Sequence, residues 1–165
     1  MDQAEERRLY GKALRSLSRR EHSRLQLLQK LKRDCSDAAL VEAVLDRLTE
    51  DGLLSDVRFA ESLCLSRIGR GYGEFYIRRE LANKGVNIEI VSEVLSQVLE
   101  AQGSDWPALA EAVAQRRFPH FARDTTSWHK ACRFLNRRGF SAGDIRAVLG
   151  PIPDAAGTAQ NEAPA

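Results

Sequence analysis

The sequence is poor in the features that mark secreted, membrane-spanning and disulfide-bonded proteins. Its 165 residues include three cysteines, an odd number that argues against a disulfide framework. It contains no run of eighteen apolar residues, about the length of a membrane-spanning helix. The opening Met-Asp-Gln-Ala-Glu-Glu lacks the basic and apolar regions of a signal peptide. We therefore expect a cytoplasmic protein that makes no contact with a membrane.

Patterns typical of enzymes and metal sites are also missing. The three histidines are scattered, and neither Cys-x-x-Cys nor His-Glu-x-x-His occurs. The string Gly-Phe-Ser-Ala-Gly at 139–143 matches a nucleophile elbow, but no histidine follows it in the chain. The glycine-rich stretch 69–73 lacks the Lys-Ser/Thr ending of a phosphate-binding loop, so we interpret it as a break between helices. We predict no catalytic residue, no cofactor and no metal site.

The sequence contains one pattern of apolar residues three times. The second copy lies fifty residues after the first, and the third lies fifty-four residues after the second. The equivalent positions are Leu27, Leu31, Val41, Val44, Leu45 and Leu48, then Ile77, Leu81, Val91, Val94, Leu95 and Val98, then Ala131, Leu135, Ile145, Val148 and Leu149. Their steps of three and four residues are those of helices, not strands. A further helix is expected before each pair, over 5–20, 56–67 and 105–117.

Helix starts and stops recur with the same displacements. Residues suited to N-caps open the two helices of each pair, namely Ser23, Gly73 and Ser127 for the first and Asp37, Asn87 and Ser141 for the second. Ser55 and Ser104 are the corresponding caps proposed for the preceding helices. Gly85 and Gly139 fall where a helix stops in the left-handed conformation. The first repeat has no glycine at this corner, at 33–36, so we expect its turn to be closed differently.

These patterns predict an all-α fold of tandem three-helix repeats stacked into an elongated, curved rod. A three-helix piece of about fifty residues is marginal alone, so neighbouring repeats should share apolar surface. The repeats are expected at 1–54, 55–102 and 103–150. Residues 151–165 have no periodicity and are predicted to be a disordered tail.

Positive charge gathers in the third repeat, although the net charge is only +2. Residues 103–150 hold eight Lys or Arg against four acids. Our first candidates for contact with a partner or DNA are Arg79, Lys84, Arg133, Arg137 and Arg138, and our second are Arg67, Arg70, Arg116 and Arg117. Nearby aromatic residues could stack on bases, namely Phe75, Tyr76, Trp128 and Phe134. The alternative is a solvated basic surface that complements the helix dipoles, with the aromatic rings in the core.

An ordered set of motifs carries a family resemblance. They are Asp-Val-Arg-Phe-Ala at 56–60, Gly-Tyr-Gly at 71–73, Ile-Arg-Arg-Glu-Leu-Ala-Asn-Lys-Gly-Val at 77–86 and Phe-Leu-Asn-Arg-Arg-Gly-Phe at 134–140. Over about 10–149 the chain resembles the RecX family of bacterial recombination regulators. It departs from the family pattern at Ser55, where a second acid is common, and at the corner 33–35. We interpret the motif residues Asp56, Phe59, Ala60, Gly73, Gly85 and Gly139 as structural.

The resemblance implies a non-enzymatic modulator of RecA in DNA recombination, DNA repair and the SOS response. Such a protein binds the RecA filament on single-stranded DNA and mainly inhibits its extension, ATPase, strand exchange and coprotease activity. It would act as a monomer and could bind DNA weakly by itself. The residues alone leave two other functions open. One is direct, sequence-independent nucleic-acid binding, and the other is a helical-repeat adaptor between proteins.

Overall fold

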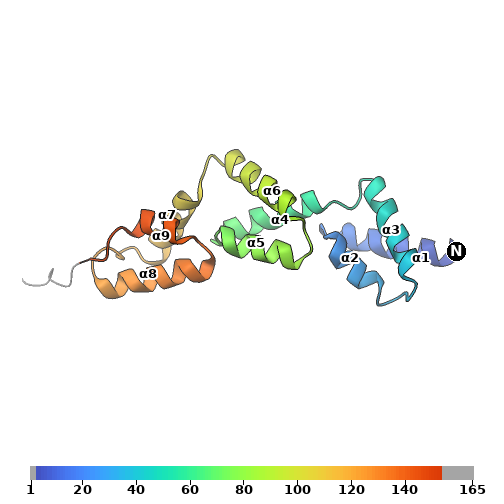
Figure 1. Ribbon diagram of the computed structural model, residues 1–165, viewed down its shortest axis with the longest axis horizontal. Helices are drawn as coiled ribbons and strands as arrows, with labels where there is room; N and C mark the ends of the chain where they lie inside the picture. The colour runs from blue at the N-terminus through green and yellow to red at the C-terminus, as the bar shows by residue number, and fades with distance from the viewer. Residues whose placement is uncertain (1–2, 154–165) are drawn as a thin grey trace, which may run out of the picture. The chain divides into compact units, whose positions relative to one another are not determined.

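The computed structural model describes residues 3–153, which contain helices and no strand (Figure 1). The helices of this range are α1 (Gln3–Leu17), α2 (Arg24–Leu31), α3 (Ala38–Glu50), α4 (Asp56–Gly69), α5 (Glu74–Asn83), α6 (Ile88–Ala101), α7 (Trp106–Arg117), α8 (Thr125–Arg138) and α9 (Ala142–Leu149). The all-α prediction is therefore confirmed for the described residues. None of these helices has the length and apolar character needed to span a membrane. Of the predicted tail, 154–165 lie outside the described range.

Residue contacts divide the chain into two compact units. The chain passes from the first unit to the second after Ser66, returns to the first after Ile77 and passes to the second again after Val98. The first unit therefore contains α1 to α3 and most of α6, whereas the second contains α7 to α9. Helices α4 and α5 each contribute to both units.

The core of the first unit is built from the predicted repeat positions. All six predicted apolar positions of α2 and α3 are fully buried, and Leu9 and Ala13 of α1 pack with them. Ser23 caps α2 in a reciprocal capping box with Gln26, and Asp37 caps α3, as predicted. Apolar faces brought together by three short helices thus account for this core.

The corner after α2 closes without a left-handed residue, as its sequence predicts. Helix α2 ends in the right-handed region at Lys32, and the backbone N–H groups of Asp34 and Cys35 both donate to the Leu31 carbonyl. The Asp34 carboxylate is ion-paired with Lys12 of α1. This hydrogen bond from Lys12 holds the pKa of Asp34 below its usual range. The Lys12–Asp34 ion pair therefore stabilises this corner, whereas a left-handed glycine ends the equivalent helix in the other two repeats.

The helix starts in the second unit differ from the prediction at two places. Helix α7 is capped by Asp105 instead of Ser104, and α8 is capped by Asp124 instead of Ser127. Ser127 instead donates its backbone N–H to Asp124 Oδ1 at 2.8 Å, and this bond holds the pKa of Asp124 below its usual range. A carboxylate is the stronger acceptor at the positive end of a helix dipole, which favours these acids over the neighbouring serines.

The core of the second unit also follows the repeat. Ala131, Leu135, Ile145 and Leu149 are buried with Phe140, whereas Val148 is only partly buried at its edge. Ser141 caps α9 in a capping box with Asp144, and its hydroxyl donates to Asp144 Oδ2 at 2.6 Å. The serine of the apparent nucleophile elbow therefore sits at a helix start.

Asp56 joins two consecutive repeats in the first unit. Its Oδ1 accepts the backbone N–H of Arg24, the first residue of α2, at 2.8 Å. The start of its own helix is served instead by Ser55, whose Oγ accepts the N–H of Arg58 at 3.3 Å. The proposed cap Ser55 thus serves α4, whereas Asp56 acts on α2. It satisfies an otherwise unpaired N–H of the preceding repeat.

The glycine corners of the later repeats lie against the preceding repeat at equivalent positions. In the first unit, Ser23 Oγ donates to the Lys84 carbonyl at 2.7 Å. In the second, the N–H of Gly73 donates to the Arg138 carbonyl at 2.8 Å. The residues after these carbonyls, Gly85 and Gly139, have φ of +76° and +87°, the left-handed conformation predicted for them. We call these two contacts the repeat joints.

Phe59 is expected to carry a large share of the stability of the first unit. Its side chain is 5% exposed, so Phe59→Ala should lower the free energy of unfolding by about 3 to 5 kcal/mol. Urea unfolding followed by circular dichroism measures this loss. Val57→Ala on the same helix is the matched control, because Val57 is 42% exposed and should cost less than about 0.5 kcal/mol. A Phe59→Ala variant as stable as this control would contradict the buried role.

Candidate functional site

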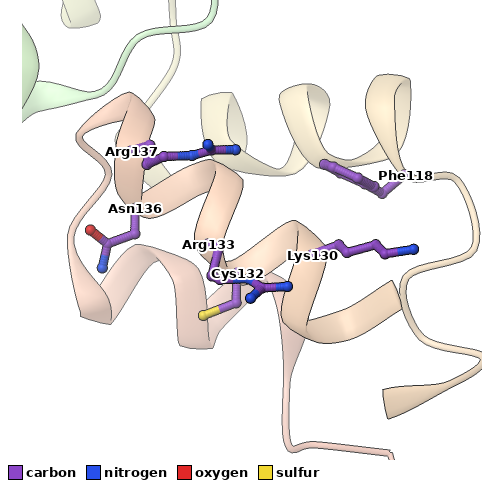
Figure 2. A pocket seen from close by; sticks show the side chains of 6 residues that line it. All are labelled: Phe118, Lys130, Cys132, Arg133, Asn136 and Arg137. Carbon is purple, nitrogen blue, oxygen red and sulfur yellow. The ribbon is translucent and has the colours of Figure 1, made fainter. Parts of the chain in front are cut away.

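Helix α8 presents three cations on one face. Lys130, Arg133 and Arg137 are spaced three and four residues apart, so they point to the same side of the helix. With Phe118, which ends α7, they line a hollow of about 620 Å³ (Figure 2). We call it the α8 hollow. Cys132 and Asn136 complete its lining.

The cations of the α8 hollow have no ion-pair partner within the described part of the chain, although Lys130 attracts the Asp124 carboxylate at longer range. No carboxylate lines the hollow, and none of its three cations forms an ion pair or an internal hydrogen bond with a described residue. Arg137 in the last turn complements the helix dipole, but Lys130 and Arg133 stand too far from the helix end to do so. The site is therefore suited to binding an anionic surface.

Two arginines of the first unit, by contrast, have acidic partners. Arg24 Nη2 lies 2.8 Å from Glu42 and 2.7 Å from Asp46. Arg58 Nε lies 2.9 Å from Glu21. Acidic partners thus hold these side chains in place, whereas the cations of the α8 hollow remain available to a partner.

Arg138, a first-choice candidate, is engaged within the second unit. Its Nη1 donates to the Arg70 carbonyl at 2.8 Å. Its guanidinium carbon lies 4.5 Å from the centre of the Tyr72 ring and 5.0 Å from that of Phe134, in the range of cation–π contacts. These contacts give Arg138 a role in holding the turn between α4 and α5 against α8.

The other sequence candidates are spread over both units. Arg133 and Arg137 come together in the α8 hollow, while Arg79 and Lys84 belong to the first unit. The second-choice residues Arg70, Arg116 and Arg117 are exposed, and Arg67 is half-buried. The binding role of all these residues remains a prediction.

Sequence reasoning missed Lys130 and Phe118 as members of the hollow. The spacing of Lys130 from Arg133 and Arg137 on one predicted helix could have identified the lysine. Nothing in the sequence indicates Phe118, because it reaches the hollow through the packing of α7 beside α8. Its ring meets that of Phe134 edge to face, with centres 5.5 Å apart, so it forms a fixed wall.

Most of the aromatic residues proposed for base stacking have partners inside the second unit. Tyr76 stacks on Tyr72 with ring centres 4.1 Å apart. Trp128 donates its indole N–H to the Leu149 carbonyl at 3.2 Å. Phe75 is the exception among the four, since 60% of its surface is exposed.

The described residues contain no group of three or more His, Cys, Asp or Glu side chains placed to hold a metal ion. What the fold and the site define together is a helical-repeat protein with a basic hollow that no described carboxylate lines. Sequence models of three RecX domains match the chain in order: the first three-helix domain at 10–48, the second at 55–95 and the third at 105–149. The chain belongs to the RecX family.

Individual relatives agree with this assignment. A protein of Halorhodospira halophila called regulatory protein RecX is 44% identical over 137 residues, which cover 82% of this chain and 83% of the relative. A regulatory protein RecX of Pseudomonas fluorescens is 38% identical over 138 residues, covering 83% and 86%. A crystal structure of RecX from Lactobacillus salivarius has a TM-score of 0.76 at 19% identity, covers 88% of this chain and 95% of its own, and shares the fold.

Proposed function

We propose that this chain binds the RecA filament on single-stranded DNA and restrains it, chiefly by inhibiting extension, ATP hydrolysis, strand exchange and coprotease activity. Membership of a family of regulatory proteins supports a regulator. The partner itself follows from the family resemblance. The observation that carries the proposal on this chain is the set of unpaired cations Lys130, Arg133 and Arg137 in the α8 hollow.

The physical basis is binding without chemistry. A filament presents the same anionic surfaces repeatedly, on its protein subunits or on its DNA, and three tandem domains can make several modest contacts at once. Linked contacts strengthen one another because the second forms at a high effective concentration. A regulator held in this way has to leave before the filament can extend or rearrange at that place. We propose that it acts in the cytoplasm as a monomer and needs no cofactor.

The test is the single-stranded-DNA-dependent ATPase activity of RecA, with this protein titrated in. We expect inhibition at well below one regulator per RecA subunit, because one bound molecule affects a run of subunits. Binding to the same DNA without RecA is measured in parallel over a range of salt concentrations. Absence of inhibition together with tight, steeply salt-dependent DNA binding would replace this proposal with direct nucleic-acid recognition. Absence of both would favour an adaptor between proteins.

A further inference from the structure

A groove in the first unit has a lining unlike that of the α8 hollow. Its volume is about 430 Å³, and it is formed by the start of α2, the end of α3, the turn after α3, the start of α4 and one residue of α6. Leu54, Val57 and Ile90 supply its apolar lining. Val57 is exposed and Ile90 is half-buried, so their side chains can pack against a partner. We call this surface the α4 groove.

The two cations that line the α4 groove, Arg24 and Arg58, are held by acids of the same unit. Arg24 Nη2 contacts both Glu42 and Asp46, and Arg58 Nε contacts Glu21. Two carboxylates share the single guanidinium of Arg24, so that cluster keeps a net negative charge. The guanidinium groups in the lining therefore do not make the groove a site for anions.

Further acids lie at the α4 groove. Asp56 lines it, and the Oδ1 of this residue accepts the backbone N–H of Arg24 at 2.8 Å. Glu50 and Glu89 are exposed, and each is the direct chain neighbour of a residue that lines the groove. Within residues 3–153, neither glutamate side chain makes an ion pair or a hydrogen bond. The rim of the groove is therefore acidic, and two of its carboxylates remain available to a cation.

An apolar lining beside an acidic rim discriminates between classes of partner. The rim repels phosphates and acidic peptides, because like charges placed together across an interface are unfavourable. A small inorganic cation would pair with the carboxylates but would leave Val57 and Ile90 uncovered. A protein segment with an apolar side chain between lysines or arginines matches both parts of the surface, as amphipathic segments do in apolar grooves.

We infer that the α4 groove docks a basic and apolar segment of a partner protein. An apolar side chain of this segment packs against Val57 and Ile90, and flanking Lys or Arg side chains pair with Glu50 and Glu89. The α8 hollow is suited to the opposite charge, so the two units recognise different kinds of surface. This docking requires no RecA, and its test is therefore separate from that of the proposed function.

The experiment measures binding of a fluorescein-labelled peptide to the full chain by fluorescence anisotropy, without RecA or DNA. The peptide consists of leucine and lysine, with its leucines three and four residues apart so that they form one face of a helix. The first test variant is Glu50→Gln/Glu89→Gln. Loss of two exposed charge contacts should weaken binding about tenfold. Both side chains are exposed and lack internal partners among the described residues, so the fold should be unchanged.

A second variant, Val57→Asn, tests the apolar contact without changing charge. We expect it to weaken binding of the same peptide about three- to tenfold, because less apolar surface is covered on docking. The matched control for the charge variant is Glu100→Gln/Glu111→Gln, which removes two exposed acids outside the groove. Binding by this control should stay close to that of the wild type.

Four outcomes would overturn the inference. They are absence of binding by the wild type, equal weakening by the charge variant and its control, equal binding of a peptide whose leucines are shuffled so that they form no face, and equal binding of a leucine–glutamate peptide. Sedimentation of the unliganded chain over a range of concentrations tests a second copy as the occupant. Self-association that Glu50→Gln/Glu89→Gln abolishes would replace the partner segment with another molecule of this chain.

Discussion

Gly139→Ala is expected to lower the free energy of unfolding of the second unit by about 2 to 6 kcal/mol. A β-carbon at this position would lie 2.4 Å from the backbone nitrogen of Tyr76 and 2.6 Å from its β-carbon. The residue also has φ of +87°, where a side chain is strained. Backbone strain of about 1 to 3 kcal/mol and overpacking of about 1 to 3 kcal/mol add together here. Tyr76 cannot relieve the contact by changing rotamer, since its backbone is one of the touching groups.

Gly103→Ala separates the two causes. Gly103 lies in the same unit and is also left-handed, with φ of +56°, but a β-carbon there would meet nothing within 4 Å. Its replacement should therefore cost only the strain. Urea unfolding compares the two variants. Hydrogen exchange gives a local readout at the joint, because the N–H groups of Gly73 and Phe75 donate to the carbonyls of Arg138 and Gly139. Equal destabilisation by both variants, with these two amides still protected, would rule out the tight contact.

Replacing Lys130, Arg133 and Arg137 together by glutamine should raise the concentration needed to inhibit the RecA ATPase about ten- to a hundredfold. Exposed charge contacts are worth up to about 1 kcal/mol each, and three of them correspond to a change of this size. The side chains have no internal partners among the described residues, so melting and helicity should be unchanged. Arg138 is left in place because its contacts are internal.

The control is Arg7→Gln/Arg15→Gln/Arg146→Gln, which removes three exposed charges outside the α8 hollow. We expect inhibition by this variant to remain near the wild-type level. Raising the salt concentration should weaken the wild type more than the α8 variant, because screening acts on contacts that the variant has already lost. Inhibition by the α8 variant at the wild-type concentration would remove the hollow from the proposed contact surface.

The helices and their buried faces could be predicted because both depend on local spacing. Leu27, Leu31, Ile77 and Leu81 recur at the helical interval, and all four are fully buried. Gly139 was predictable as a left-handed stop for the same local reason. Its second role, close contact with Tyr76, was not, because those residues are distant in sequence and meet only after the helices pack.

The site was less predictable than the fold for a similar reason. A row of basic residues on a helix predicts positive charge at that place. It does not predict whether other groups of the same chain bind these side chains. Arg137 and Arg138 are neighbours in sequence, yet Arg137 lines the α8 hollow and Arg138 lies over the Tyr72 ring. The direction of each side chain around the helix separates them, and the position of Tyr72 depends on tertiary packing.

The repeat joints carry an evolutionary consequence. Each is closed by a main-chain carbonyl, of Lys84 or Arg138, and followed by a glycine that has no side chain to contribute. Selection for the joint therefore acts on backbone shape and on the smallness of a few residues. Lys130, Arg133 and Arg137 take no part in either joint, so they can change without loosening the assembly of consecutive domains. During evolution the binding surface of the domains can therefore change while the contacts that couple consecutive domains are kept.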